Sequence, residues 1–371
     1  MRSKPKFNEI IPKFTFDGEF LRAEPYGFGH INDTYTAYFR KADGEEHRYI
    51  VQRINHDVFK KPEGLMLNIL GVTEHIRKKI EANGGNPDRE TLTLIPTKEG
   101  KSFFRTPSGN YWRAYLFIEG AQTYQIPVRL EQVKNAAYAF GKFQQYLEDY
   151  PADELIETIP DFHHTVRRLE HFQEILEADT FNRAFFVQDE INFVLQRTHE
   201  TSLVVDLIKS GQIPLRVTHN DTKFNNVMID DEDGSGICVI DLDTVMPGSL
   251  LYDFGDAIRS ITNTAEEDER DLDKVHFDMD VFRTYVEGYQ QALLDTCLLE
   301  EIENLAFSAR LLTLECGMRF LTDYLDGDQY YKIHRENHNL DRCRTQFRLV
   351  VEMEEKYSEM QAAVSDAFRK V

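Results

Sequence analysis

The chain has 371 residues, of which 41% are hydrophobic and 12% aromatic, enough to build the cores of two or three structural units. Its formal net charge of −21 argues against a protein that binds nucleic acid, since such proteins present a dominant basic face. No apolar run reaches the roughly 18 residues that span a bilayer, MRSKPKFNEIIPKF lacks the apolar core of a signal peptide, and the four cysteines are scattered. We therefore expect a cytoplasmic protein without a membrane segment.

The first third of the chain is expected to form a small sheet with one helix. Two strand-like stretches, FLRAEPYGFG and INDTYTAYFR, are followed after an Asp-Gly turn by a third, HRYIVQRIN. Apolar residues at three- and four-residue steps then predict a helix over residues 60 to about 83. Three further strands, TLTLIPT, KSFFRT and YWRAYLFIEG, complete this unit, which we assign to residues 1–119.

The remainder of the chain, residues 120–371, is expected to be mainly helical. Apolar residues share one face over 130–143 and again over 311–321, at helical spacing. One island, VMIDDEDGSGICVID, is typical of a hairpin. The predicted fold class is therefore α+β, with a small antiparallel-sheet N-lobe and a larger, mainly helical C-lobe.

The segment VTHNDTKFNNVMID, just before this hairpin, has the clearest chemical pattern. His219, Asp221 and Asn226 follow H-x-D-x-x-x-x-N, the spacing of a kinase catalytic loop, and His219, Asp221 and Lys223 are the candidate catalytic residues. In that geometry Asp221 accepts or orients the proton of the attacking hydroxyl and Asn226 holds Mg²⁺, while Lys223 could neutralise charge on the transferring phosphate. The alternative is a polar loop between helices, because Asn and Asp are common turn residues.

The strand ICVID favours the catalytic interpretation, because it ends at Asp241. A carboxylate at the end of a buried strand is unfavourable unless it is paired or coordinates a cation. We expect Asp221, Asn226 and Asp241 to converge on one Mg²⁺, which phosphate oxygens and water would complete. Asp243 is a further candidate metal ligand.

The triplet DFG at residues 253–255 marks the magnesium aspartate in protein kinases, but its context here is different. It follows the turn Pro247-Gly248 and has no strand before it. We expect Asp253 to open or cap the next helix and Asp256 to support the catalytic loop.

Together, HNDTKFNNVM, IDLDTVMPG and LYDFGD resemble the aminoglycoside phosphotransferase and choline kinase superfamily, whose fold is similar to that of protein kinases. Within it, YGFGHINDTY and YIVQRINHDVF most resemble the N-acetylhexosamine 1-kinases. The resemblance runs from about residue 20 to at least 335. It implies a bilobal, protein-kinase-like fold, with nucleotide bound by the N-lobe, and ATP and Mg²⁺ as cofactors.

The other parts of an ATP site can be sought on this basis. Gly27 and Gly29 lie in a turn between two strands, where backbone N–H groups could cover the phosphates. YLFIEG resembles the hinge between kinase lobes, where the backbone of Phe117 to Glu119 would bond the adenine edge.

Arg53 takes the place of the strand lysine of protein kinases, as in choline kinases, with Val51 facing the adenine. Arginine gives a forked, permanently charged donor that suits phosphate. Gln52 at the adjacent position leaves the register open by one residue. The acidic partner of Arg53 could be Glu63 or Glu74.

The acceptor is expected to be small. Asn220 stands where protein kinases have the arginine that follows the catalytic-loop histidine, and the segment from 241 to 253 is too short for a peptide platform. The resemblance implies that Arg319 and Tyr330 contact a sugar or its acetamido group, and more loosely His30. The alternatives are a surface salt bridge for Arg319 and helix packing for Tyr330.

The expected activity is ATP-dependent phosphorylation of the anomeric hydroxyl of N-acetylglucosamine or N-acetylgalactosamine. A kinase of another small alcohol, such as choline, homoserine or an aminoglycoside, is an alternative, and a nucleotide-binding pseudokinase is another. The acidic segment 266–280 could be a solvated face or a lid over the acceptor. The sugar epimer, the pathway and the oligomeric state stay open.

Overall fold

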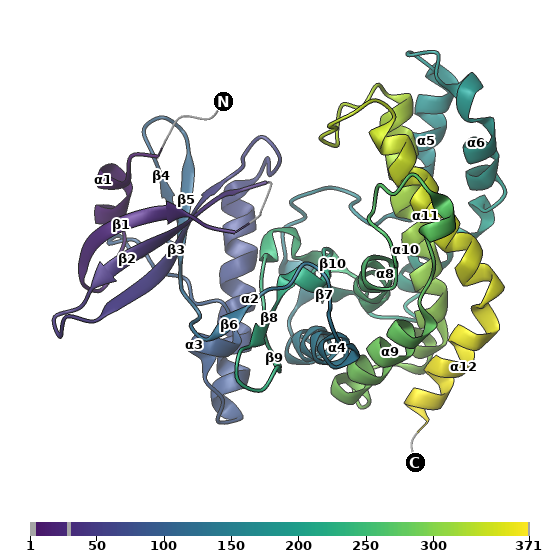
Figure 1. Cartoon of the computed structure of the whole chain (residues 1–371). Coiled ribbons are helices and arrows are strands. Elements are labelled where there is room, and N and C mark those ends of the chain that lie inside the picture. Colours follow the sequence, from purple (N-terminus) through teal and green to yellow (C-terminus); the bar gives the residue numbers. More distant parts are fainter. Residues whose placement is uncertain (1–4, 28–30, 370–371) are drawn as a thin grey trace.

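The N-lobe is built around an antiparallel sheet with the strand order β1-β2-β3-β5-β4. The computed structural model describes residues 5–27 and 31–369, and Figure 1 shows the sheet at one end of the molecule. Helix α2 packs on one face of the sheet and the short helix α1 on the other. The elements of this lobe are α1 (Phe7–Ile10), β1 (Glu19–Pro25), β2 (Asp33–Arg40), β3 (Glu46–Ile54), α2 (Pro62–Ala82), α3 (Pro87–Glu90), β4 (Phe104–Arg105) and β5 (Tyr111–Leu116).

Strand β3 is covered on both faces. Tyr49 and Val51 pack with Ile10 of α1 on the outer face, whereas Ile50 and Ile54 belong to the core beneath α2. Successive side chains of a strand point to opposite faces. Residues 50, 52 and 54 therefore face α2 and the C-lobe, while 49, 51 and 53 face outward.

Helix α2 confirms the prediction for residues 60–83, but the strand predicted at TLTLIPT is wrong. That segment makes isolated bridges, such as Leu94 with Tyr115, instead of a continuous ladder. Pro96 interrupts the pairing because it has no N–H to donate. KSFFRT likewise forms a strand only at β4.

The C-lobe is mainly helical, as predicted, and VMIDDEDGSGICVID forms the expected hairpin, β8 and β9. Strand β6 joins this hairpin, and β7 pairs with β10 nearby. The expectation of a turn at Pro247-Gly248 with no strand before the DFG triplet is wrong, because both residues belong to β10, which directly precedes α8. The elements are β6 (Ala121–Gln122), α4 (Leu130–Tyr146), α5 (Thr165–Ala178), α6 (Gln188–Leu195), α7 (Leu203–Lys209), β7 (Arg216–Thr218), β8 (Val227–Asp230), β9 (Gly236–Val239), β10 (Met246–Gly248), α8 (Leu250–Ile261), α9 (Met279–Leu293), α10 (Leu299–Leu325), α11 (His338–Glu355) and α12 (Tyr357–Phe368).

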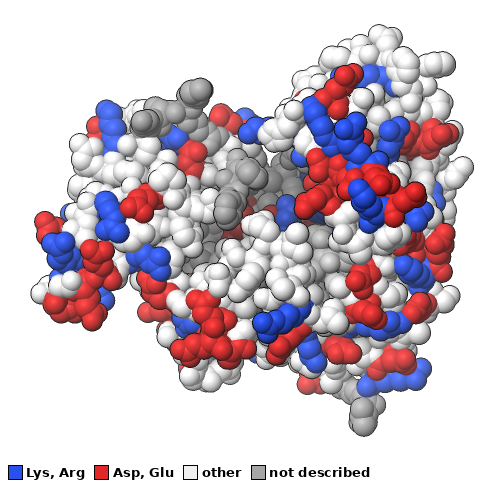
Figure 2. Space-filling view, viewed as in Figure 1, with Lys and Arg blue, Asp and Glu red and all other residues white. Residues whose placement is uncertain are grey.

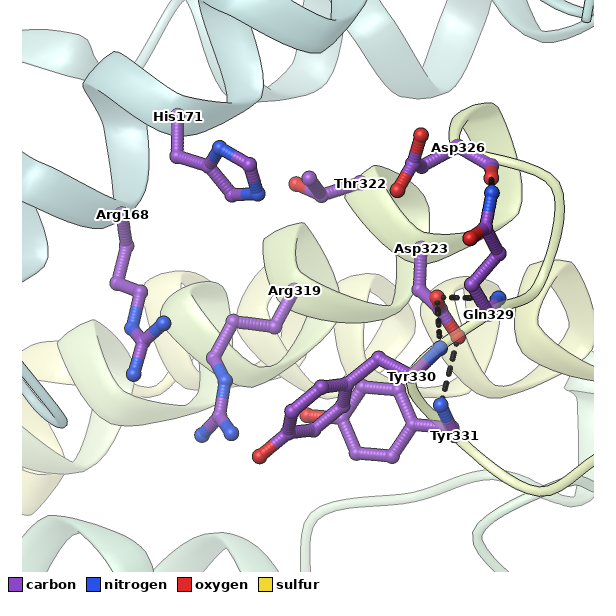
Figure 3. Close-up of a pocket in the computed structure, with 9 residues that line it drawn as sticks. All are labelled: Arg168, His171, Arg319, Thr322, Asp323, Asp326, Gln329, Tyr330 and Tyr331. Atoms are coloured by element: carbon purple, nitrogen blue, oxygen red, sulfur yellow. Dashed lines mark hydrogen bonds between the residues drawn. The ribbon is translucent and has the colours of Figure 1, made fainter. Parts of the chain in front are cut away.

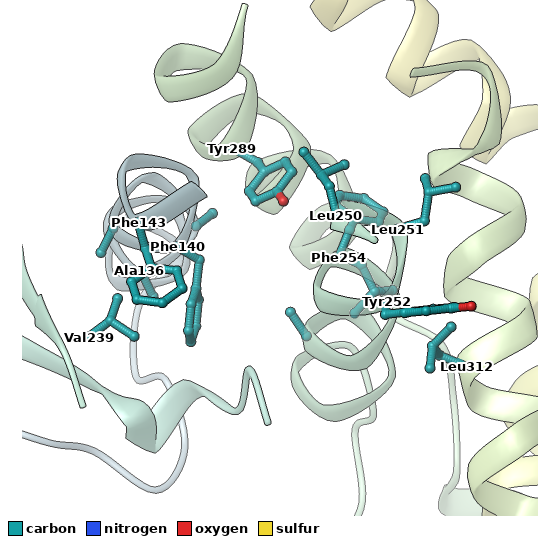
Figure 4. Packing of buried hydrophobic residues seen from close by; sticks show 14 of the residues in the cluster. Ala136, Phe140, Phe143, Val239, Leu250, Leu251, Tyr252, Phe254, Tyr289 and Leu312 are labelled. Carbon is teal, nitrogen blue, oxygen red and sulfur yellow. The ribbon is translucent and has the colours of Figure 1, made fainter. Parts of the chain in front are cut away.

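The core of the C-lobe lies between α4, α8, α9 and α10 (Figure 4). Phe140 of α4, Phe254 of α8 and Tyr289 of α9 are each at most 2% exposed. Helices α4 and α9 approach closely because Gly288 lies against the backbone carbonyl of Lys134, where a β-carbon would clash. This packing fixes α8, which carries the residues that support the catalytic loop.

The two lobes meet across a hollow in the surface, visible in Figure 2. The N-lobe sheet ends at Leu116, and β6 already pairs with the C-lobe hairpin; the boundary at residue 119 stays a prediction. Over the described residues of the face in Figure 2, acidic and basic side chains are interspersed. In the part of the chain that the structure describes, no helix is long and apolar enough to cross a membrane.

Candidate active site

The catalytic loop, residues 219–226, follows β7 and is held by two aspartates of α8. Asp253 accepts hydrogen bonds from the backbone N–H groups of His219 (2.9 Å) and Asn220 (2.8 Å). Asp256 accepts one from the N–H of Thr222 (2.8 Å). Both carboxylates are almost completely buried. Asp256 therefore supports the loop, as predicted. Asp253 lies in the first turn of α8, but the helix cap is Ser249, and Asp253 also supports the loop, which was not predicted.

His219 lies behind the site and not in it. It is fully buried, its Nδ1 accepts from the N–H of Asp221 (3.3 Å), and its Nε2 donates to the carbonyl of Ile240 (2.8 Å). These two bonds fix the tautomer and join the catalytic loop to the strand that leads to Asp241. The direct catalytic role predicted for His219 is corrected to a positioning role, because a fully buried ring cannot reach a substrate.

Asp221, Lys223 and Asn226 come together as predicted. Lys223 Nζ lies 2.9 Å from Asp221 Oδ1, and Asn226 Nδ2 donates to the backbone carbonyl (2.8 Å) and to Oδ2 (3.2 Å) of Asp221. Asp221 raises the pKa of Lys223 above its usual range, so the ammonium stays charged. Because the Asn226 amide nitrogen faces Asp221, its amide oxygen is left for a cation.

Asp241 adopts the left-handed backbone region, with φ 59° and ψ 55°, a conformation that Asp and Asn tolerate better than most residues and that Asn220 of the same site shares. The side chain of Asp241 is accessible to solvent. Desolvation by the surrounding protein, followed by repulsion from Asp243 and Asp221, raises the pKa of Asp241 to about 7.

The donor set fits Mg²⁺. Among the described residues, no cluster of three or more His, Cys, Asp or Glu side chains could hold a metal by itself. Mg²⁺ is commonly bound through one or two protein oxygens together with substrate phosphates and water. The carboxylate of Asp241 and the amide oxygen of Asn226 match that requirement, and a cation there would relieve the repulsion at Asp241.

Asp243 does not fit the metal role predicted for it. It is 3% exposed, and both of its oxygens already accept hydrogen bonds, one from Arg113 Nη1 and the other from Asn32 Nδ2 (2.6 Å). An oxygen with this pairing has little capacity left for a cation. Neither Arg113 nor Asn32 was singled out in the sequence, because both are distant from Asp243 along the chain.

The position of Arg53 also differs from the prediction. Its guanidinium lies on the outer face of the sheet, where Nε donates to Asp33 Oδ2 (2.6 Å) and the group lies 5.7 Å from the ring of Trp112. Its acidic partner is therefore Asp33, and neither Glu63 nor Glu74. On the inner face the neighbouring residue is Gln52, so the expected phosphate contact of Arg53 is not supported.

Val51 likewise faces the outer core and not the adenine side. At the expected hinge, Arg48 stacks on Phe117 at 3.7 Å and its Nε donates to Glu119 Oε1 (2.9 Å). Tyr26, which the sequence did not single out, lies edge-on to Phe117 at 5.6 Å and places a second aromatic ring there. The adenine contacts of Phe117 and Glu119 stay predictions.

Of the phosphate-loop residues, Gly27 adopts φ 76°, a conformation that favours glycine, and an added β-carbon would meet open space. Gly29 and His30 lie outside the described residues.

A pocket of about 300 Å³ opens in the C-lobe beside α10 (Figure 3). Arg319 and Tyr330, two of the three residues predicted to contact the acceptor, line it. The lining consists of Arg168, His171, Arg319, Thr322, Asp323, Asp326, Gln329, Tyr330 and Tyr331. Arg168 and Asp326 were not singled out in the sequence: Arg168 stands in a polar stretch of α5, and Asp326 follows the end of α10 directly.

Two arginines form one end of this pocket. Figure 3 shows the guanidinium groups of Arg168 and Arg319 pointing the same way. Arg168 donates to the carbonyl of Phe162 (3.0 and 2.8 Å), and Arg319 lies over the Phe162 ring at 5.1 Å. Burial and then the charge of Arg319 lower the pKa of Arg168. Among the described residues Arg319 forms no ion pair with a carboxylate, so the surface salt-bridge alternative is not supported.

The opposite wall is set by Asp323. Its carboxylate accepts hydrogen bonds from the N–H groups of Gln329 (2.9 Å), Tyr330 (2.7 Å) and Tyr331 (2.9 Å). These bonds fold the chain after α10 back over the pocket. Tyr330 is consequently 66% exposed, which argues against the helix-packing alternative.

The pocket is connected to the catalytic loop through the residue after Phe162. His163 Nδ1 lies 2.8 Å from Glu315 Oε1, and its Nε2 lies 3.4 Å from the carbonyl of Asn220, the residue before Asp221. Phe162, which contacts Arg168 and Arg319 of the pocket, thus adjoins a residue that contacts the loop carrying the candidate base.

Comparison with known proteins agrees with this geometry. The family model described as the phosphotransferase enzyme family, APH, matches residues 23–292. An aminoglycoside phosphotransferase from Alicyclobacillus acidocaldarius is similar over 100% of this chain and 98% of its own, at 11% identity and a TM-score of 0.62. An amicoumacin kinase solved with AMP-PNP, Ca²⁺ and Ami covers 91% of this chain and 90% of its own, at 13% identity and a TM-score of 0.55.

A choline kinase from Cryptosporidium parvum covers 94% of this chain and 93% of its own, at 11% identity and a TM-score of 0.55. These structures share the kinase-like fold, with its antiparallel-sheet N-lobe. The family match spans well over half of the chain. The chain therefore belongs to the APH phosphotransferase enzyme family and is a phosphotransferase with an alcohol acceptor.

Proposed function

We propose that the protein transfers the γ-phosphoryl group of ATP to the anomeric hydroxyl of free N-acetylglucosamine or N-acetylgalactosamine, with Mg²⁺ as the metal. The support consists of the catalytic residues around Asp221, the character of the pocket beside α10, and the resemblance of the sequence to N-acetylhexosamine 1-kinases. Phosphoryl transfer depends mainly on positioning and on stabilising charge.

The catalytic residues have separable tasks in this proposal. Asp221 accepts or orients the proton of the acceptor hydroxyl, and Lys223, held 2.9 Å from it, faces the charge of the transferring group. Asn226 and Asp241 would hold Mg²⁺, and the chemistry that the ion supplies when bound is neutralisation of charge on the phosphate oxygens. Asp253 and Asp256 keep the loop in place. The joint presence of these groups also favours an enzyme over a nucleotide-binding pseudokinase.

The observation that carries the sugar proposal is that positively charged groups line one end of the pocket, and carboxylate and amide groups line the other. Donors of Arg168 and Arg319 stand at one end, Asp326 and Gln329 at the other, and tyrosine rings lie between (Figure 3). A sugar presents hydroxyl groups that both donate and accept, and apolar ring faces that can pack on aromatic rings. An N-acetyl group adds a carbonyl oxygen that suits a guanidinium donor.

At its arginine end this lining disfavours the ammonium group of a cationic acceptor such as choline or an aminoglycoside, so a cation would have to lie at the Asp326 end. Two positively charged guanidinium groups would repel an ammonium group. Two carboxylates of the acidic segment 266–280, which could have attracted one, are paired with basic neighbours: Glu267 with Arg259, and Asp268 with Arg335 and His338.

Position 1 of the sugar is favoured for a chemical reason. The anomeric hydroxyl is more acidic than the other ring hydroxyls, so a carboxylate such as Asp221 is least handicapped there as a proton acceptor. We also place the protein in the cytoplasm, where ATP is available and where its four cysteines, none of them in a disulfide, would stay reduced.

An acceptor screen tests the proposal. ATP consumption with Mg²⁺ is measured for free N-acetylglucosamine and N-acetylgalactosamine, for choline, for homoserine and for an aminoglycoside. The proposal predicts turnover with the N-acetylhexosamines and little with the cationic compounds. Brisk turnover of choline or an aminoglycoside, beside none of any hexosamine, would overturn it.

A further inference from the structure

Arg113 of β5 and Asp243 of the turn Leu242–Thr244 form an ion pair across the two lobes. Arg113 is 2% exposed and Asp243 is 3% exposed. Isolated charges are strongly disfavoured in such an environment, so each group depends on the other. Both residues lie where the inner face of the N-lobe sheet meets the loop that carries Asp241.

On the N-lobe side, hydrogen bonds connect this ion pair, which includes β5, to β2 and β3 or to the residues next to them. Arg113 Nε donates to Gln52 Oε1 (3.0 Å) on β3, and Gln52 Nε2 donates to Thr34 Oγ1 (2.8 Å) on β2. Asn32, just before β2, donates to the second oxygen of Asp243 (2.6 Å) and accepts from the N–H of Asn55 (2.9 Å).

On the C-lobe side, the turn that contains Asp243 is fastened to the catalytic loop. The carbonyl of Thr244 accepts from Asn220 Nδ2 (2.8 Å), and Thr244 Oγ1 donates to the carbonyl of His219 (2.7 Å). Asp241 therefore stands two residues from a carboxylate held by the N-lobe, in a turn whose other end is held by the catalytic loop.

We infer that Arg113, Asp243 and Asn32 are positioning residues that couple the nucleotide-binding strands to the metal site. They hold Asp241 where it can share a cation with Asn226, and Asp243 itself does not bind the metal. Groups that orient a metal ligand in this way typically contribute 10- to 100-fold to metal affinity or activity. The inference rests on the proposed Mg²⁺ site and is independent of the identity of the acceptor.

The test is titration of the full-length protein with ATP, with and without Mg²⁺, which gives the gain in ATP affinity due to the metal. Arg113→Gln and Asp243→Asn are each predicted to reduce that gain about tenfold. The double variant should lose no more than either single variant, because the two residues act as one unit. If Asp243 were a metal ligand instead, Arg113→Gln would keep or increase the gain, since a cation near the metal would have been removed. That result would overturn the inference.

Two further variants separate coupling from loss of stability. Arg216→Gln breaks another buried ion pair, with Glu301, inside the C-lobe, and is expected to lower the melting temperature without changing the Mg²⁺ gain. Asn32→Ala removes the second hydrogen bond to Asp243 from a half-buried site that should tolerate truncation, and it is predicted to lower the gain by roughly threefold. An unchanged gain in folded Asn32→Ala protein would count against the coupling, even if Arg113→Gln fails to fold. If Mg²⁺ did not increase the ATP affinity of the wild-type protein, the proposed metal site would be refuted, and the coupling with it.

Discussion

Replacing Asp241 or Asp253 by asparagine should separate the proposed metal-binding aspartate from the structural one, because the first change should affect Mg²⁺ binding and the second should affect stability. Asp253 receives three hydrogen bonds on two buried oxygens, from the N–H groups of His219 and Asn220 and from Gln144 Nε2 (2.6 Å). The asparagine side chain keeps one acceptor oxygen, but its NH₂ group replaces the other oxygen. That NH₂ group would face an N–H donor, with which it cannot form a hydrogen bond. A buried donor left unsatisfied costs about 1–3 kcal/mol, so Asp253→Asn should destabilise the protein by about 2–4 kcal/mol.

Asp241→Asn should instead leave the melting temperature of the metal-free protein unchanged or raise it. The protein around Asp241 and the carboxylates of Asp243 and Asp221 raise its pKa, so a neutral side chain relieves repulsion. The same change should abolish the gain in ATP affinity that Mg²⁺ provides.

Thermal unfolding without nucleotide, together with ATP titration with and without Mg²⁺, measures both effects. If Asp253→Asn loses the Mg²⁺ dependence at full stability while Asp241→Asn keeps it, the assignment of the two aspartates is wrong.

Three more variants probe the site and the fold. Asp221→Asn should lower kcat by on the order of 10²–10⁴ while ATP binding measured by calorimetry persists, because Asp221 acts on the acceptor. Arg319→Met should raise the KM for the acceptor about tenfold or more and leave the KM for ATP unchanged, since a charged hydrogen bond contributes about 1.5–3 kcal/mol. Burial opposes ionisation of Glu352, but the N–H of Phe277 (2.8 Å), His276 and Lys356 lower its pKa from 4.5 to about 2. The ionised form thus stabilises the fold above pH 4.5, and this stabilisation, at most about 3 kcal/mol, is lost as the pH falls toward 2. In denaturant titrations over that pH range, Glu352→Gln should show a shallower loss than the wild type, and equal losses would contradict the assignment.

The parts of the site that sequence alone could predict are those in which spacing is local. His219, Asp221 and Asn226 lie within one loop, and Asp241 follows the next hairpin, so the proximity of Asp221, Lys223 and Asn226 could be predicted from the order of residues, while their roles stay proposals. The two lobes followed from a change of periodicity near residue 120.

The register of β3 could not be predicted, because this strand is covered by α1 on one face and by α2 on the other. The alternation of polar and apolar residues that normally sets the register is therefore absent. Gln52 and Arg53 could each have faced the cleft, and Arg53 was preferred for its charge. Its pairing with Asp33 on the outer face could only be seen in the structure.

The role of Asp243 could not be predicted for a different reason. Its position two residues after Asp241 suggested a second metal ligand, whereas its actual partners, Asn32 and Arg113, come from strands far away in the chain. Contacts between distant segments leave no local pattern, and the same applies to Arg168 in the pocket beside α10.

The position of the phosphate in the product tests the central proposal most directly. The protein is incubated with ATP, Mg²⁺ and free N-acetylglucosamine or N-acetylgalactosamine, and the phosphate is located by phosphorus–proton NMR, with the 1-O-methyl glycosides as matched controls. The proposal predicts phosphate on carbon 1 and no turnover of the methyl glycosides, whose anomeric oxygen has no proton to give to Asp221. Phosphate on carbon 6, or equal turnover of the methyl glycoside, would contradict the 1-kinase while leaving the phosphotransferase in place.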